Sequence, residues 1–372
     1  MYRNIFRLNL TIFLQITVRM NSFAKDIVKM KIFFYSLTLL IFFSAQGFSQ
    51  SQDSKAITYK TIFDDPNDLY KLWIGLQPLY TDLFVSNLNI GFGAQAHYYH
   101  GTLFDCKIQA RKAYGEFSDQ YRNLSNKSDS KNVGGSSTSI KYEPTVFNYF
   151  EVGGTYHVVD KVQQGKAKII LYSKRYKDWS STVPQYIWVP AQVRLIYGAR
   201  LGGIWFDTTT DLQRALQKQN TSISNREGTQ TIDGNSGNLF GNVHTRALYI
   251  GGSATRIKNI AIKPDKGYGV LLNDIILTAY FDLIIAPSVK VDDVILGNDL
   301  GDTRYLTESI KTRMIGGRVG IDGLFNREFS WSYGAEIGFR PSVASGGFYT
   351  LIKLGFPVFG TKLSQQKEAF GK

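Results

Sequence analysis

The chain has 372 residues, of which 43% are hydrophobic and 20% charged, a balance that excludes a disordered protein. Its 22 tyrosines, 25 phenylalanines and 35 glycines favour strands over helices. The formal net charge of +13 is not clustered as it is in nucleic-acid binders, and a single cysteine, Cys106, excludes an internal disulfide framework.

The first pattern along the chain is an export signal at residues 30–47. Met30 and Lys31 precede twelve mostly apolar residues, 32–43, and small residues follow up to Gly47. A basic start, an apolar stretch and a small-residue cleavage site are typical of a secretory signal peptide, with an uncleaved membrane anchor as the alternative. We interpret residues 1–29, which precede this complete signal, as a gene-model extension upstream of Met30.

From residue 71 onward, apolar and polar side chains alternate with a period of two. The pattern is clearest in residues 329–340, where six apolar side chains fall on one face and Ser, Gly, Glu and Arg on the other. Successive side chains of a strand point to opposite faces, so each such segment predicts a strand with one apolar face. The other segments are 88–99, 104–114, 149–158, 166–175, 189–205, 245–258, 271–285, 314–322 and 348–358.

The length of these segments favours strands that cross a membrane. Several exceed the roughly 5–6 residues common in soluble sheets, whereas a tilted membrane-spanning strand needs about 9–11. The polar faces are rich in Gly and charge, as the lumen of a barrel is. Aromatic residues mark the apolar faces near strand ends, where they predict contact with lipid headgroups: Trp73, Tyr98, Trp188, Trp205 and Trp331.

A signal peptide followed by long alternating strands with aromatic ends resembles the outer-membrane β-barrel proteins of Gram-negative envelopes. The resemblance covers about residues 71–358 and depends on architecture rather than on a family motif. It implies an all-β fold, a transmembrane antiparallel up-and-down barrel in the outer membrane, surrounded by its lipid. Residues 48–70 would then be a periplasmic N-terminal segment and 359–372 a polar C-terminal tail. The alternative is a soluble secreted β-sandwich that binds glycans.

The number of strands depends on where the long polar gaps emerge. Such barrels have long external loops and short periplasmic turns. The long gaps are 116–139, 207–243 and 287–310, and the short turns are 100–101, 263–266 and 325–328. We predict twelve strands, because adding residues 71–80 and a strand seeded at 186–189 puts all three long gaps outside. Ten strands is the alternative.

Charged side chains of both signs fall on the predicted inward faces. They form a candidate lumen network: Lys107, Arg111, Glu151, Arg194, Arg200, Asp274, Asp282, Arg318, Asp322, Glu336, Arg340 and Lys353. Adjacent strands would bring Arg318 and Asp322 opposite Glu336 and Arg340, within pairing distance. Two interpretations remain open, a polar path through the lumen or a lumen filled by side chains whose charges neutralise each other. The second is favoured for a small barrel.

Residue types that support catalysis or metal binding are sparse. His244, at the end of the longest gap, is a candidate general base, and a surface histidine is the other interpretation. Asp292, Asp293, Asp299 and Asp302 could hold Ca²⁺, but their spacing matches no EF-hand and favours a solvated acidic loop. We therefore expect no catalytic residue, no cofactor and no metal.

The predicted function is that of an outer-membrane barrel with a non-catalytic structural or accessory role, or a narrow pore. Its three long loops would be presented to another envelope protein or to an extracellular ligand. The alternative from another class is a barrel enzyme that acts on envelope lipid, because such enzymes place a histidine base near the outer rim.

Overall fold

The computed structural model describes residues 58–84, 87–115, 118–119, 124–125, 139–140, 145–171, 185–235, 239–265, 269–298, 301–327, 330–344 and 346–364. The predicted signal peptide and the upstream extension lie outside the described residues. Residues 48–57 of the predicted N-terminal segment lie outside them too. In the described part of the chain, no helix is long and apolar enough to cross a membrane.

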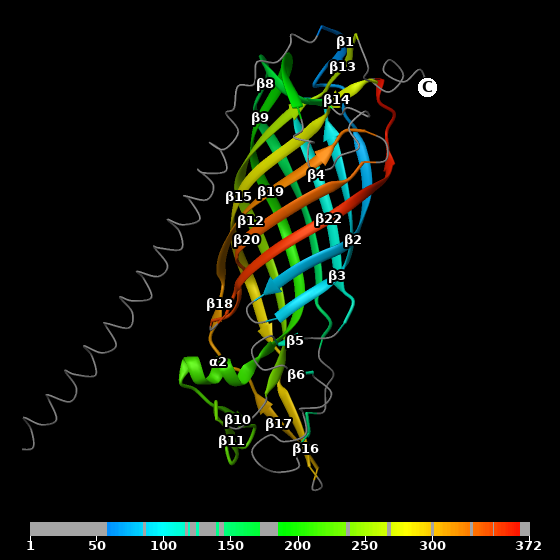
Figure 1. Ribbon diagram of the computed structural model, residues 1–372. Helices are drawn as coiled ribbons and strands as arrows, with labels where there is room; N and C mark the ends of the chain where they lie inside the picture. The colour runs from blue at the N-terminus through cyan, green and yellow to red at the C-terminus, as the bar shows by residue number, and fades with distance from the viewer. Residues whose placement is uncertain are drawn as a thin grey trace, which may run out of the picture. The chain divides into compact units, whose positions relative to one another are not determined.

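Ten long antiparallel strands of the described chain close into a barrel (Figure 1). Each strand pairs with the next, and β2 pairs with both β3 and β22, so the sheet has no open edge. The predicted all-β antiparallel up-and-down barrel is confirmed. Its strands are β2 (Leu72–Phe84), β3 (Asn87–His100), β4 (Phe104–Ala113), β8 (Asn148–Leu171), β9 (Gln185–Asp211), β12 (Phe240–Lys258), β15 (Ile275–Val291), β19 (Ile315–Phe325), β20 (Ser332–Phe339) and β22 (Phe348–Gly360).

The preferred count of twelve strands is wrong, and the alternative of ten is correct. The segment 71–80 does form a strand, from Leu72 onward within β2. The predicted strand 149–158 and the described part of 166–175, residues 166–171, belong to the single strand β8, and 186–189 lies at the start of β9. β8 and β9 stay paired from Asn148↔Asp207 to Leu171↔Gln185, far beyond the length needed to span a bilayer. Alternation lapses at residues 159–165 because both faces of β8 are largely exposed there, and the lapse resembles a turn in the sequence.

The single β8 strand also explains where the connections emerge. The gaps 114–147, 212–239 and 292–314 all leave the barrel at one end, here called the long-loop end. The β3–β4 turn, the β12–β15 and β19–β20 connections, the start of β2 and the end of β22 lie at the other, here called the short-turn end. Gly101 adopts a left-handed conformation (φ +55°) in the β3–β4 turn.

Much of the expected long loops folds into a cap at the long-loop end (Figure 1). The cap consists of the helix α2 (Leu212–Gln219) and a five-stranded sheet in the order β11-β10-β17-β16-β7. Its apolar core includes Leu212, Leu216, Ile223 and Val294. The cap strands are β7 (Ser139–Ile140), β10 (Ile223–Asn225), β11 (Thr231–Ile232), β16 (Val294–Asn298) and β17 (Gly301–Leu306).

Short strands complete the two ends of the barrel. At the long-loop end, β5 (Ser118–Asp119) pairs with β3 and β6 (Leu124–Ser125), and β18 (Thr312–Arg313) pairs with β21 (Ser342–Val343). At the short-turn end, β1 (Tyr59–Asp64), β13 (Ile260–Pro264) and β14 (Leu271–Asn273) form a three-stranded sheet. This sheet packs on Val189 and Ala191, which are buried, so their predicted exposure to lipid is wrong.

The barrel exterior is apolar, as the alternation predicts. On β20 and β22 the predicted apolar faces point outward, with Ile337 47% and Ile352 63% exposed, while Glu336 and Lys353 are buried. The aromatic residues Tyr98, Trp188, Trp205 and Trp331 are exposed as expected. Trp73 is the exception: it is buried in an apolar cluster with Leu69, Tyr99 and Leu363 at the short-turn end.

Candidate functional site: the charged lumen

A cluster of buried ion pairs crosses the middle of the lumen. Arg318 on β19 donates to Glu151 on β8, with Nη2 2.5 Å from Oε1, and to Asp282 on β15, with Nε 2.7 Å from Oδ2. Asp282 also accepts from Nε of Arg200 at 2.9 Å. Tyr149 donates to Oε2 of Glu151 at 2.6 Å. Because the four charged side chains are all nearly inaccessible to solvent, each carboxylate has guanidinium groups in place of water.

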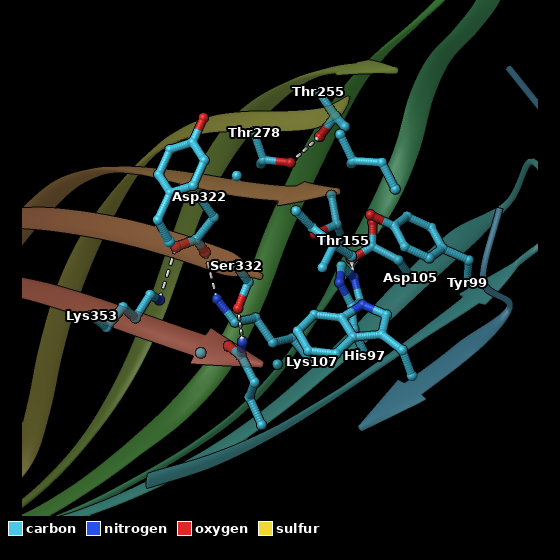
Figure 2. A pocket seen from close by; sticks show the side chains of 18 of the residues that line it. His97, Tyr99, Asp105, Lys107, Thr155, Thr255, Thr278, Asp322, Ser332 and Lys353 are labelled. Atoms are coloured by element: carbon cyan, nitrogen blue, oxygen red, sulfur yellow. Dashed lines mark hydrogen bonds and ion pairs between the residues drawn. The ribbon is translucent and has the colours of Figure 1, made fainter. Parts of the chain in front are cut away.

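A second group of ion pairs, formed by Lys107, Asp322 and Lys353 (Figure 2), lies nearer the short-turn ends of β4 and β19. Asp322 accepts from Nζ of Lys107 at 2.6 Å and lies 2.9 Å from Nζ of Lys353. Glu336 lies 3.7 Å from Lys353 and 3.8 Å from Arg318, and so links the two groups. Of the pairing predicted across the β19–β20 hairpin, only the Arg318–Glu336 contact forms, and it is the longest contact that Arg318 makes with a carboxylate.

On the long-loop side, the lumen is filled by aromatic rings and arginines. Arg340 pairs with Asp82 at 2.8 Å and lies over the ring of Tyr349, 3.7 Å from its centroid. Arg111 lies over Tyr149 at 3.9 Å. The apolar core around them consists of Tyr80, Phe84, Phe147, Tyr149, Ile204, Phe206, Ala247, Tyr249, Ile284, Tyr349 and Leu351, among others.

Two of the predicted residues lie apart from this network. Arg194 pairs with Asp160 at 2.5 Å and donates to the carbonyl of Gly101 at 3.0 Å, next to the β3–β4 turn. Asp274, before the start of β15, pairs with Arg327 at 2.6 Å. Both pairs are therefore at the short-turn end rather than in the middle of the lumen.

Sequence reasoning missed Asp82, the fully buried partner of Arg340. The pairing of β2 with β3 shifts register between Gln77 and Tyr80, so Leu76 and Leu79 both point outward while Gln77 and Tyr80 point inward. A bulge of this kind breaks the period of two. The available signal was Pro78, because proline inside a strand is confined to edges and bulges.

A cavity of about 60 Å³ lies between the ion pairs and the apolar cluster at the short-turn end. Beside the cavity, Asp105 accepts from Nε2 of His97 at 2.9 Å (Figure 2). It also accepts from Nε2 of His157 at 3.0 Å. Trp73 and Tyr99 of the apolar cluster form part of its wall. The volume suits a few water molecules, and it is far smaller than the aqueous channel of a large porin.

Glycines let the tyrosine rings cross the lumen. Tyr249 on β12 lies against Gly153 on β8 and Gly202 on β9, where a Cβ atom at either glycine would overlap the ring. The Tyr249 ring in turn lies 4.7 Å from the guanidinium carbon of Arg318. The glycines on the inward faces therefore provide space for the side chains that fill the lumen, rather than for a passage.

His244, the candidate base, lies beyond the apolar exterior at the long-loop end. Its Nδ1 is 2.8 Å from Asp207 and its Nε2 is 3.0 Å from Asp292. Burial lowers the pKa of His244, but the hydrogen bonds and charges of the two carboxylates outweigh it and raise the pKa above 6.5. An imidazole that donates from both nitrogens has no lone pair to accept a proton, so this geometry does not suit a general base.

The acidic residues near this histidine do not gather into a metal site. Asp292 is engaged by His244, and Asp293 pairs with Arg304 at 2.7 Å, while Asp299 lies outside the described residues. Among the residues that the structure describes, no group of three or more His, Cys, Asp or Glu side chains could hold a metal ion.

Comparison with known proteins finds barrels of similar type at low similarity. No protein-family model and no curated protein matches the chain. Solved structures that it resembles include a TodX deletion mutant described as a monoaromatic hydrocarbon channel (10% identity, 78% of this chain and 90% of that chain, TM-score 0.24). The chain also resembles the toluene transporter TbuX of Ralstonia pickettii (10% identity, 80% of this chain and 92% of that chain, TM-score 0.22). A third is OmpT, an outer membrane protein of Vibrio cholerae (10% identity, 80% of this chain and 99% of that chain, TM-score 0.16).

At these TM-scores the matches carry no argument about function, and the class follows from the molecule itself. A closed antiparallel barrel satisfies every backbone hydrogen bond between its strands, which is what a sheet needs in order to span a bilayer. With an apolar outward face and charged inward faces, the chain is a transmembrane β-barrel of the outer-membrane type.

Proposed function

We propose that this protein is a non-conducting scaffold in the outer membrane of a Gram-negative cell, which anchors and presents the cap at the cell surface. The observation that carries the proposal is the filled lumen: Arg318 bridges Glu151 and Asp282 across the barrel, and Arg340 lies among aromatic rings on the long-loop side. An open aqueous pore would leave such charges hydrated, whereas these are almost fully buried.

The folded cap supports a role at the surface. A five-stranded sheet with its own apolar core is larger than a barrel needs for closing its strands, and it would offer a rigid surface to another envelope protein or to an extracellular ligand. Under this proposal the short-turn end faces the periplasm, as short turns do in barrels of this class. The role is non-catalytic, in keeping with the double engagement of His244.

A narrow polar path is the second candidate function, and the cavity of about 60 Å³ favours it. Conductance in planar lipid bilayers separates the two candidates. The wild-type protein is first shown to be folded by the faster gel migration of the unheated sample. If the protein is a scaffold, the folded barrel should then give no stable conductance steps. Regular steps with ion selectivity would support the path and contradict the scaffold.

A matched variant tests whether the filling side chains cause closure. Tyr149→Ala with Tyr349→Ala removes two rings that flank Arg340, whose guanidinium carbon lies 5.3 Å and 3.7 Å from their centroids. If this folded variant conducts and the wild type does not, the lumen is closed by these side chains. Ile352→Ala, which shortens an exposed side chain on the exterior of β22, is the control and should remain silent.

A further inference from the structure

Arg111 on β4 differs from every other arginine of the lumen. Its side chain is buried, and its Nε, Nη1 and Nη2 atoms all lack a hydrogen-bond partner among the described residues. Arg200, Arg318 and Arg340 each have a carboxylate within 3 Å. Burying a guanidinium without a carboxylate or water leaves its desolvation cost uncompensated.

Among the lumen charges that pair base to acid, one base is left without an acid. The bases of the lumen are the partly exposed Lys107 and the buried Arg111, Arg200, Arg318, Arg340 and Lys353. Its acids are Asp82, Glu151, Asp282, Asp322 and Glu336. Six bases therefore face five acids, and each base except Arg111 has one of these acids within 4 Å. Asp105 is not counted here, because its partners are His97 and His157 rather than one of these bases.

Aromatic rings, rather than a directly paired carboxylate, surround the Arg111 guanidinium; the charges of Glu336 and Asp82 act on it without a hydrogen bond. Arg111 lies over Tyr149, and Tyr80 is the other ring beside it, 5.7 Å away. Cation–π contacts offset only part of the desolvation cost. Gly93 adjoins the side chain of Arg111 and Oε1 of Gln77, and both amide atoms of Gln77 lack a hydrogen-bond partner among the described residues. Nη1 of Arg340, whose guanidinium carbon lies 5.3 Å from the centroid of the Tyr149 ring, has none either.

We propose that Arg111 binds a small monovalent anion inside the lumen, and chloride is the probe. One anion would place a negative charge beside Arg111 and would also accept hydrogen bonds from its guanidinium N–H groups. A monovalent ion matches the single base that has no acid beside it. The aromatic rings and Gly93 around Arg111 favour a compact ion over an organic anion. The site is independent of whether the barrel conducts.

The test compares the thermal unfolding of the full barrel in detergent in chloride and in gluconate at equal ionic strength. Chloride should raise the midpoint, by roughly 2 °C for each tenfold increase in concentration above its dissociation constant. Arg111→Gln should remove this dependence. Lys112→Gln removes the same charge at the next residue, whose side chain is exposed, and should keep it.

Two results would overturn the site. One is a wild-type midpoint that is the same in both salts, as water at Arg111 would give. The other is an Arg111→Gln variant that retains the chloride dependence of the Lys112→Gln control. If Arg111→Gln does not fold, crystals of the wild-type barrel soaked in bromide decide the question. An anomalous peak in contact with the Arg111 guanidinium is expected, and its absence would refute the proposal.

Discussion

The buried ion pairs make Arg318 the residue whose loss should cost the barrel most. Its guanidinium lies within 3 Å of both Glu151 and Asp282, and it also accounts for one contact to Glu336. Arg318→Met keeps much of the side-chain volume. Asp282 still has Arg200 as a partner after this change, but Glu151 loses the base with which it pairs. Breaking a buried pair by removing one partner costs about 3–5 kcal/mol of unfolding free energy.

The assay is equilibrium unfolding by urea in lipid vesicles, with the single variant Glu151→Gln and the double variant Arg318→Met, Glu151→Gln alongside. The double variant should recover part of the loss, because neutralising both partners leaves no uncompensated charge. Arg304→Met is the matched control: Arg304 pairs with Asp293 at 2.7 Å in the cap but is exposed, so its loss should cost about 0–1 kcal/mol. An Arg318→Met cost no larger than that control, or strictly additive single costs, would refute the reasoning.

Three further perturbations test the exterior, the base of the cap and the packing of the lumen. Ile337→Arg places a charge on the outward face and should cost about 2–4 kcal/mol of folding free energy in vesicles. Val358→Arg, near the end of its strand, should cost about 0–1 kcal/mol. Equal costs would contradict the membrane depth assigned to these two residues. Because the pKa of His244 is raised in the folded protein, its contribution to stability is fully present below about pH 6.5 and is lost as pH rises through the folded pKa. The difference in unfolding midpoint between wild type and His244→Gln should therefore shrink from pH 5.5 to pH 9. A difference that grows with pH would contradict this assignment. Gly202→Val should displace the Tyr249 ring and lower stability by about 1–3 kcal/mol, measured by the same unfolding assay, and an unchanged midpoint would show that the ring does not fill this space.

The alternation of apolar and polar residues was enough to predict the barrel and most of its inward-facing charges. β20 illustrates this: Glu336 points inward and Ile337 outward, as the period of two requires. The period fixes the face of each residue because one face meets lipid and the other meets the lumen. The period of two fails in the part of the β8–β9 hairpin that extends past the barrel, where neither face meets lipid or the lumen. The wrong strand count arose from this part of the chain.

The partners of the charges could not be predicted in the same way. The sequence brings neighbouring strands together, but Arg318 pairs with Glu151, which is far away in the chain and reaches it across the lumen. The inward orientation of Asp82 could not be predicted, because the bulge between Gln77 and Tyr80 exchanges the inward and outward faces of β2. The cap was missed because its strands are two to six residues long and its segments are polar overall, so no period could be read from them.

The central claim, a lumen closed on the long-loop side, is tested most directly by the accessibility of a cysteine within it. In a Cys106→Ser background, Ser332→Cys places a thiol in the wall of the cavity, beyond the ion pairs as seen from the cap. A membrane-impermeant thiol reagent is added to the cap side of vesicles, and Thr229→Cys, in an exposed part of the cap, is the labelled control. The account predicts rapid labelling of the control and none at Ser332→Cys; labelling of both at similar rates would show a continuous aqueous path and contradict it.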